Sequence, residues 1–198
     1  MGFETTKSIA RRSYDKRYAT RYLVGTGIDI GAGVDSIGRY APLFPLMGEV
    51  WAWDKQDGDA MAMEDVGDAT FDFVHSSHCL EHVYDPAVAL KNWVRICKPG
   101  GHVLILVPDE DLYEQGVWPS LYNSDHKWTF TIGKQTSWSP CSVNVVELVR
   151  QVWDQADVLK IELLDNNYFY GAQQFDQTQT MLGESAIEIV LRRKDGGP

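Results

Sequence analysis

The sequence predicts an α/β fold in which a doubly wound, mostly parallel sheet carries helices on both faces. Three observations support this prediction. Apolar runs of strand length alternate with helix-like segments, as in parallel strands joined by crossovers. The first such run ends in a loop with two glycines, a common arrangement at the end of a first parallel strand. The 198 residues, 44% of them hydrophobic, suffice for one domain with its own core, which we expect to span residues 1–198.

Six segments have the composition of strands. Each is rich in β-branched, aromatic or aliphatic residues and is bounded by polar or glycine-containing stretches. In chain order they are Thr26–Ile30, Glu49–Asp54, Phe71–Ser77, His102–Asp109, Val158–Asp165 and Ala186–Arg193. Because parallel strands end at one edge of a sheet, polar residues that follow them are expected to gather there.

The clearest helix follows the third strand. Asp85 is a good N-cap and Pro86 suits the first helical position, while Ala89, Trp93 and Cys97 form an apolar face. The stretch Lys98–Gly101, "KPGG", should end this helix, because proline and paired glycines cannot continue it. A second helix is predicted over "VNVVELVRQVWDQA", residues 143–156.

Two further segments are expected to cover the sheet edge. Residues 1–24 predict an N-terminal helical cover in which Tyr14, Tyr18 and Tyr22 share one stripe; the stripe is either a lid or plain packing. Residues 110–140 form a long aromatic and polar segment with few regular patterns, which is usual for functional loops. We expect this segment to line an acceptor site, because aromatic walls with polar tips suit small ligands, sugar rings included.

Charge and cysteine content restrict the partners. A formal net charge of -10 disfavours nucleic acid, whose phosphates attract a basic face. No apolar run approaches the roughly 20 residues of a membrane span, and the basic N-terminus lacks the apolar core of a secretory signal. Three separated cysteines favour a reducing cytoplasm over a disulfide framework. Nothing in the sequence indicates an oligomeric state.

The stretch "GIDIGAGVDSIGRY", Gly27–Tyr40, is typical of loops that hold nucleotide-like cofactors. A dinucleotide fingerprint would require a third glycine, but Ser36 stands in that place. Asp29 precedes the loop, where its carboxylate would repel a pyrophosphate. The same carboxylate would stabilise a cofactor that carries a sulfonium and an ammonium group and no phosphate. The loop therefore favours S-adenosyl-L-methionine, and a nicotinamide dinucleotide stays open as the weaker alternative.

Five segments between Gly25 and Asp109 jointly resemble the class I S-adenosylmethionine-dependent methyltransferases, particularly the broad bacterial group of small single-domain members. They are "IDIGAGVD", "WAWDK", "DGDAM", "FDFVHSSHCLEHVYDP" and "ICKPGGHVLILVPD". The resemblance implies a Rossmann-like, seven-stranded sheet with an antiparallel final strand. It also implies methyl transfer from S-adenosyl-L-methionine, with S-adenosyl-L-homocysteine as the product. The sequence departs from the family at Asp35, where a third glycine is often found, and this leaves the shape of the turn open.

The resemblance also implies roles for individual residues. Asp29 and the loop glycines would hold the methionine end, Asp54 the ribose and Asp59 the adenine, with residues after the third strand along the middle of the cofactor. The implied cofactor-binding set is Asp29, Gly31, Ala32, Gly33, Asp54, Lys55, Asp59, Ala60, Met61, Ser76, Ser77 and His78.

A base is needed when the methyl acceptor is a hydroxyl. The candidates are His78, His82, Asp109, Tyr113, Tyr122, Asp125 and His126. His126 is the first choice, because histidine titrates near neutral pH, and His82 and Tyr113 follow. The expected acceptor is a small molecule or sugar, methylated at oxygen. A protein that binds the cofactor without catalysis is the alternative from another functional class.

The stretch "HSSHCLEH" also invites a test for a metal site. His78 and His82 lie one helical turn apart with Cys79 and Glu81 between them, a spacing that zinc could use. However, Cys79 and Glu81 would point to other faces, and no second ligand pair with clear spacing is visible. The sequence therefore predicts no metal.

Overall fold

A computed structural model describes residues 3–196 of the chain. Its centre is a six-stranded sheet in the order β2-β1-β3-β4-β8-β7. The strands are β1 (Gly25–Ile30), β2 (Met47–Trp53), β3 (Phe71–Ser77), β4 (Cys97–Pro108), β7 (Ala156–Leu164) and β8 (Ala186–Arg193). Strands β1 to β4 pair in parallel, and the final strand β8 runs antiparallel to both β4 and β7. The α/β class and the antiparallel final strand are thus confirmed.

The predicted number of seven strands is wrong for the described residues, where the main sheet has six. The residues themselves supply only six strand-like runs, and the seventh came from the resemblance alone. After β2 the chain turns through residues 54–70 and enters β3 directly beside β1. This connection is polar and contains Gly58 and Gly67, so it has no apolar alternation from which an outer strand could form.

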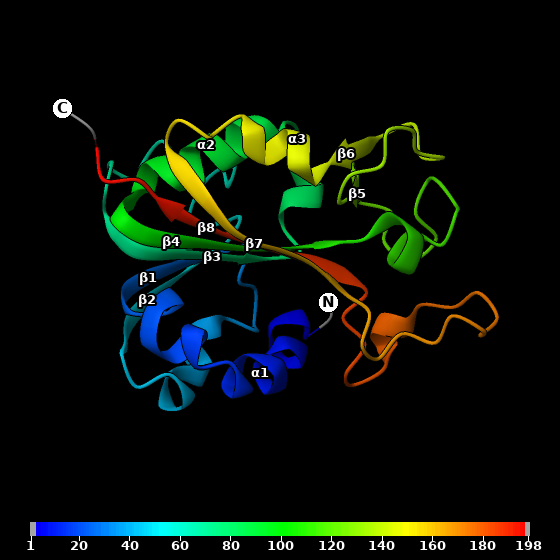
Figure 1. Cartoon of the computed structure of the whole chain (residues 1–198), viewed down its shortest axis with the longest axis horizontal. Coiled ribbons are helices and arrows are strands. Elements are labelled where there is room, and N and C mark those ends of the chain that lie inside the picture. The colour runs from blue at the N-terminus through cyan, green and yellow to red at the C-terminus, as the bar shows by residue number, and fades with distance from the viewer. Residues whose placement is uncertain (1–2, 197–198) are drawn as a thin grey trace.

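Helices cover both faces of the sheet, as predicted (Figure 1). Helices α2 (Pro86–Ile96) and α3 (Val145–Arg150) lie on one face, and α1 (Glu4–Tyr14) lies on the other. The α1 side also carries a π-helix, η1 (Tyr18–Tyr22), and a 3-10 helix, η2 (Ile37–Leu43). Each face has its own apolar core, with Trp93 of α2 fully buried on one side and Tyr18 of η1 on the other.

Local sequence features explain the boundaries of α2. The side chain of Asp85 accepts hydrogen bonds from the backbone N–H groups of Ala87 and Val88, which confirms it as the N-cap. The helix ends at Ile96, so Cys97, predicted on its apolar face, is instead the first residue of β4, which begins five residues earlier than expected. The other predicted helix, residues 143–156, is shorter: Ser142–Asn144 form β6, and only Val145–Arg150 are helical. Its Ncap is Asn144, whose side chain accepts from the Glu147 N–H.

Of the predicted tyrosine stripe at the N-terminus, Tyr18 and Tyr22 pack in the core, and the prediction is wrong for Tyr14. Helix α1 ends at Tyr14, which is 90% exposed, and the chain changes direction at Asp15 before η1 begins. Tyr18 and Tyr22 are buried and pack edge to face, with ring centroids 5.3 Å apart. These two rings therefore belong to the core, and Tyr14 does not join them.

The segment after β4 contains more regular structure than predicted. It begins with a π-helix, η4 (Glu110–Glu114), and continues to β5 (Thr129–Thr131), which pairs in parallel with β6. Two short 3-10 helices complete the fold, η3 (Leu80–His82) after β3 and η5 (Gln177–Gln179) before β8. Among residues 3–196, no helix has the length and apolar character needed to span a membrane.

Candidate active site

A cavity of about 920 Å³ lies beyond the carboxyl ends of β1, β2 and β3. Ten of the twelve predicted cofactor residues line it: Asp29, Gly31, Ala32, Gly33, Asp54, Lys55, Asp59, Ala60, Ser77 and His78. The three predicted catalytic residues, His126, His82 and Tyr113, line the same cavity. Its volume is near the upper end of the roughly 300–1,000 Å³ found for small-molecule sites.

Two predicted residues do not line the cavity. Ser76 is fully buried within β3, and its hydroxyl donates a hydrogen bond of 2.9 Å to the carbonyl oxygen of Ile30. Met61 is half-buried and packs against the apolar core beside α2.

The glycine loop is fixed by backbone contacts with β2. The N–H groups of Gly31 and Ala32 both donate to the carbonyl of Trp53, at 2.9 and 3.2 Å. Gly31 has a φ of +75°, and a Cβ at this position would lie 2.6 Å from the Cβ of Cys79. Only glycine meets both constraints, so this part of the loop brings bare backbone to the cavity.

Asp29 is 1% exposed, and both of its oxygens hold neighbouring elements. One accepts from the backbone N–H of Ile37 at 2.6 Å, which shapes the loop after the glycines. The other lies 2.6 Å from Nδ1 of His75. The guanidinium of Arg12 donates to Nε2 of His75, so the imidazole proton resides on Nδ1 and donates to Asp29.

Asp35, the departure from the family pattern, holds the N-terminal helix. Its carboxylate accepts from the backbone N–H of Thr6 at 2.8 Å and from the Thr6 hydroxyl at 2.7 Å. Tyr40 also donates to it, at 2.9 Å. Phe3, the N-cap residue of α1, provides no side-chain cap, so Asp35 caps this helix from 29 residues away.

Carboxylates dominate the cavity wall. Eight acidic residues line it, against a single lysine, Lys55. The acids are Glu4, Asp29, Asp35, Asp54, Asp59, Glu81, Asp125 and Asp176. Such a wall attracts a cation and repels a phosphate group.

Aromatic side chains form the other end of the cavity. The ring of Tyr113 lies 5.8 Å from that of Tyr122 and 5.2 Å from that of His126, between centroids. Burial raises the pKa of Tyr113 well above its ordinary value, so its hydroxyl stays protonated and can donate a hydrogen bond to a ligand. Two tryptophans of the 110–140 segment, Trp118 and Trp128, do not line the cavity, and the indole N–H of Trp128 donates to the carbonyl of Val83.

Several lining residues were missed from the sequence. Glu4 and Thr5 come from α1, and Asp176, Thr178 and Gln179 come from the connection before β8. The ammonium group of Lys7 donates to the carbonyl of Thr178, which joins the two segments. No local spacing pattern predicts this, because the joined residues lie 171 positions apart.

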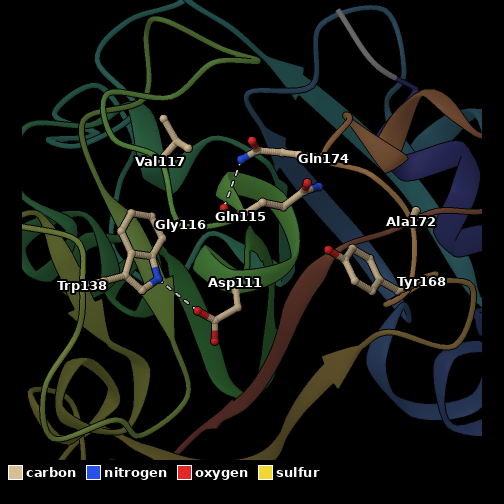
Figure 2. A pocket seen from close by; sticks show the side chains of 8 residues that line it. All are labelled: Asp111, Gln115, Gly116, Val117, Trp138, Tyr168, Ala172 and Gln174. Atoms are coloured by element: carbon tan, nitrogen blue, oxygen red, sulfur yellow. Dashed lines mark hydrogen bonds between the residues drawn. The ribbon is translucent and has the colours of Figure 1, made fainter.

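A second, shallower pocket of about 550 Å³ lies between the segment after β4 and the connection between β7 and β8 (Figure 2). Its rim is held by two hydrogen bonds, from the Trp138 indole to Asp111 at 3.0 Å and from the Gln174 amide to the carbonyl of Gln115 at 3.1 Å. None of the predicted site residues lines it. The acidic cavity is therefore the candidate active site.

Comparisons with known proteins identify the family of the chain. Residues 13–157 match the model of a family described as a methyltransferase domain. No curated protein sequence shows significant similarity to the chain.

Solved structures share the fold. A methyltransferase from Haloferax volcanii, solved in complex with the Trm112 methyltransferase activator, aligns with a TM-score of 0.61 and 14% identity over 98% of each chain. An S-adenosylmethionine-dependent methyltransferase from Archaeoglobus fulgidus aligns with a TM-score of 0.58 and 16% identity, over 96% of this chain and 94% of that one. The cyclase SpnF aligns with a TM-score of 0.54 and 14% identity, over 95% and 81%.

Proposed function

The chain belongs to the class I S-adenosylmethionine-dependent methyltransferases, and we propose that it transfers the methyl group to an oxygen of a small-molecule or glycan-type acceptor. The acidic wall of the cavity carries this proposal. A pyrophosphate would face a wall of eight acidic side chains and one lysine, whereas a sulfonium and an ammonium group would be stabilised by its carboxylates. The nicotinamide alternative is disfavoured for the same reason.

The residues that line the cavity fit S-adenosyl-L-methionine. Asp29, Gly31, Ala32 and Gly33 would hold its methionine end beside bare loop backbone. Asp54 would accept from the ribose hydroxyls and Asp59 would meet the adenine, with Lys55, Ala60, Ser77 and His78 completing the wall. Met61 and Ser76 would act by supporting that wall. When bound, the cofactor supplies an activated methyl group and leaves as S-adenosyl-L-homocysteine.

The aromatic end of the cavity would hold the acceptor. Nδ1 of His126 lies 2.7 Å from the buried carboxylate of Glu114, so its proton is held there and Nε2 is left as an acceptor. His126 would take the proton of an acceptor hydroxyl through this nitrogen. Tyr113 would orient the acceptor with its hydroxyl, and His82 lies beside His126 with ring centroids 5.0 Å apart.

Replacing His126 with alanine should lower turnover by about 10²–10⁴-fold, the usual contribution of a general base. The affinity for S-adenosyl-L-homocysteine should stay within about twofold, because His126 lies at the acceptor end. Steady-state kinetics and titration calorimetry measure the two quantities. Equal losses in turnover and in cofactor affinity would contradict a role at the acceptor.

Replacing Asp35 with alanine should release the first turn of α1 and cost about 1 kcal/mol of stability, as other lost helix caps do. Cofactor affinity should fall as well, because α1 contributes Glu4 and Thr5 to the cavity. Urea denaturation and calorimetry test both expectations. Replacing Asp154, an exposed acid away from the cavity, is a matched control that should change neither.

The rival function is cofactor binding without methyl transfer. The similarity to the cyclase SpnF is the reason to consider this rival, because it shows that the fold alone does not imply methyl transfer. A screen for product formation with sugars, quinols and amines decides between them. Methylation of a hydroxylated acceptor supports our proposal, and cofactor binding without turnover on any acceptor supports the rival. A cytoplasmic location, a bacterial origin and the single-domain boundaries stay predictions.

A further inference from the structure

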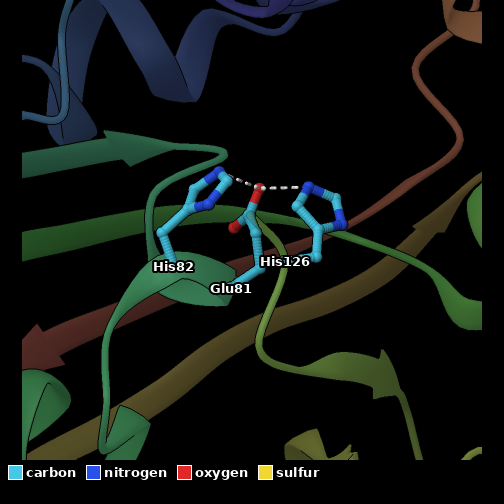
Figure 3. Close-up of side chains that lie close together, drawn as sticks. All are labelled: Glu81, His82 and His126. Atoms are coloured by element: carbon cyan, nitrogen blue, oxygen red, sulfur yellow. Dashed lines mark ion pairs between the residues drawn. The ribbon is translucent and has the colours of Figure 1, made fainter. Parts of the chain in front are cut away.

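Three side chains at the acceptor end of the cavity converge on one point. His82 and Glu81 belong to η3, and His126 reaches them from the loop before β5, 45 residues further along the chain (Figure 3). Oε1 of Glu81 lies 3.9 Å from Nε2 of His82 and 3.8 Å from Nε2 of His126. The two imidazoles flank the carboxylate.

Glu81 is buried without a polar partner at hydrogen-bond distance. Its exposure is 0%, and neither carboxylate oxygen has a hydrogen-bond partner among the described residues. Burial raises the pKa of Glu81 to about 7. A buried acidic oxygen is costly unless something positive or donating faces it.

The neighbouring imidazoles do not supply that donor. Nδ1 of His126 donates to Glu114, and Nδ1 of His82 lies 3.2 Å from both the carbonyl and the carboxylate of Asp125. Each imidazole therefore holds its proton on the far side and presents the lone pair of Nε2 toward Glu81. Three electron-pair donors face one another across less than 4.8 Å.

We propose that Glu81, His82 and His126 form a binding site for a first-row divalent metal ion. Two imidazole nitrogens and one carboxylate oxygen are the donor set of Zn²⁺, Mn²⁺ and Fe²⁺ sites that keep coordination positions open. Ligands about 2.1 Å from a tetrahedral ion lie roughly 3.4 Å apart. The two distances from Glu81 to the imidazoles, 3.9 and 3.8 Å, exceed this by a few tenths of an ångström, and all three ligand atoms lie within 4.8 Å of one another.

The groups around the two imidazoles hold them as the neighbours of metal-binding histidines do. Imidazoles that bind metals commonly donate their other N–H to a carboxylate or a carbonyl, which fixes the tautomer and the ring orientation. Glu114 does this for His126, at 2.7 Å, and Glu114 is itself 1% exposed. Asp125 does it for His82.

The sequence argument against a metal considered only ligands that lie close together in the sequence. The expected ligands were His78, Cys79, Glu81 and His82, and no second pair was visible. The fold instead supplies a third ligand, His126, from a distant segment. All three ligands line the cavity, so an ion there could bind and orient an oxygen of the acceptor. Only this role toward the acceptor rests on the proposed function; metal binding does not. The ion would then occupy the His126 nitrogen otherwise available as a base.

Metal binding is measured on the full chain, treated with a chelator, without cofactor or acceptor. Zn²⁺ and Mn²⁺ are titrated by calorimetry, and Co²⁺ by its visible absorption, which reports the ligand set. We expect one ion per chain. Glu81→Gln and His126→Asn should each weaken binding at least tenfold, and Glu114→Gln, which leaves all ligands in place, by about 10–100-fold.

The control is Glu49→Gln, an exposed carboxylate on β2, which should bind the ion like the wild type. Circular dichroism checks that each variant folds. If a ligand variant does not fold, His82→Asn is used in its place, because His82 is the more exposed ligand. Absence of saturable binding in the wild type, or equal affinity in Glu81→Gln and the wild type, would overturn the proposal. Neither outcome bears on methyl transfer, because no cofactor is present.

Discussion

Replacing Glu188 with glutamine should lower the free energy of unfolding by about 3–5 kcal/mol, the largest stability effect we expect from a single substitution. Glu188 lies on β8 with 0% exposure. Its carboxylate contacts Arg11 at 2.7 Å, Arg12 at 3.1 Å and Lys160 at 2.7 Å. A neutral amide would leave these cations without their buried counter-charge.

The same carboxylate should make stability depend on pH. Burial alone would raise its pKa, but the charges of Arg12, Arg11 and Lys160 hold the pKa of Glu188 well below its usual value. A depressed pKa contributes stability above the unfolded-state value of about 4.3, and the contribution is lost as pH falls toward the folded-state value. The gap between wild type and Glu188→Gln should therefore be full at pH 7 and narrow below about pH 4.

Urea denaturation at several pH values measures this gap. Glu147→Gln is the matched control, because its exposed ion pair with Arg150 should contribute less than about 1 kcal/mol. A loss below 1 kcal/mol for Glu188→Gln would show that the cations find other partners. A gap that does not change with pH would contradict the assigned charge state.

The second large effect is expected at the cofactor. Asp54→Ala should weaken the binding of S-adenosyl-L-homocysteine by about 1.5–3 kcal/mol, or roughly 10- to 150-fold, through the loss of a charged hydrogen bond. Asp54 directly follows β2 and lines the cavity. One of its oxygens accepts from the backbone N–H of Lys55 at 2.8 Å, and the other makes no hydrogen bond to a described residue.

Titration calorimetry measures this loss. Glu49→Ala, on the exposed face of the same strand, removes an equal charge outside the cavity and should leave the affinity unchanged. Similar losses in both variants would indicate a general effect of charge. An unchanged affinity in Asp54→Ala would remove Asp54 from the cofactor site.

The strands of the sheet and the cofactor-binding part of the cavity could be predicted from local sequence, because both depend on residues that lie close together along the chain. Apolar runs located all six strands of the main sheet, and β3 and β8 have the predicted bounds. Residues at the carboxyl ends of parallel strands gather at one edge of the sheet. The sequence therefore predicts Asp54 and Ser77 beside the glycine loop, and both line the cavity with it.

The remaining features depend on contacts between distant residues. The bond from Thr6 to Asp35 spans 29 positions, and the side-chain contacts from Glu188 through Arg12 to His75 connect β8 with β3, on either side of β4. No spacing pattern encodes such pairs. The prediction for Tyr14 was wrong for a related reason, because the stripe assumed an unbroken helix across Asp15, whose backbone is extended and ends α1.

The central claim is that the acidic cavity selects a cationic cofactor. Titration calorimetry with two cofactors tests it most directly. S-adenosyl-L-methionine and NADH are titrated separately into the wild-type chain and into Asp54→Ala. We expect one molecule of S-adenosyl-L-methionine per wild-type chain, weaker binding to the variant, and no measurable binding of NADH. Binding of NADH without binding of S-adenosyl-L-methionine would contradict the account.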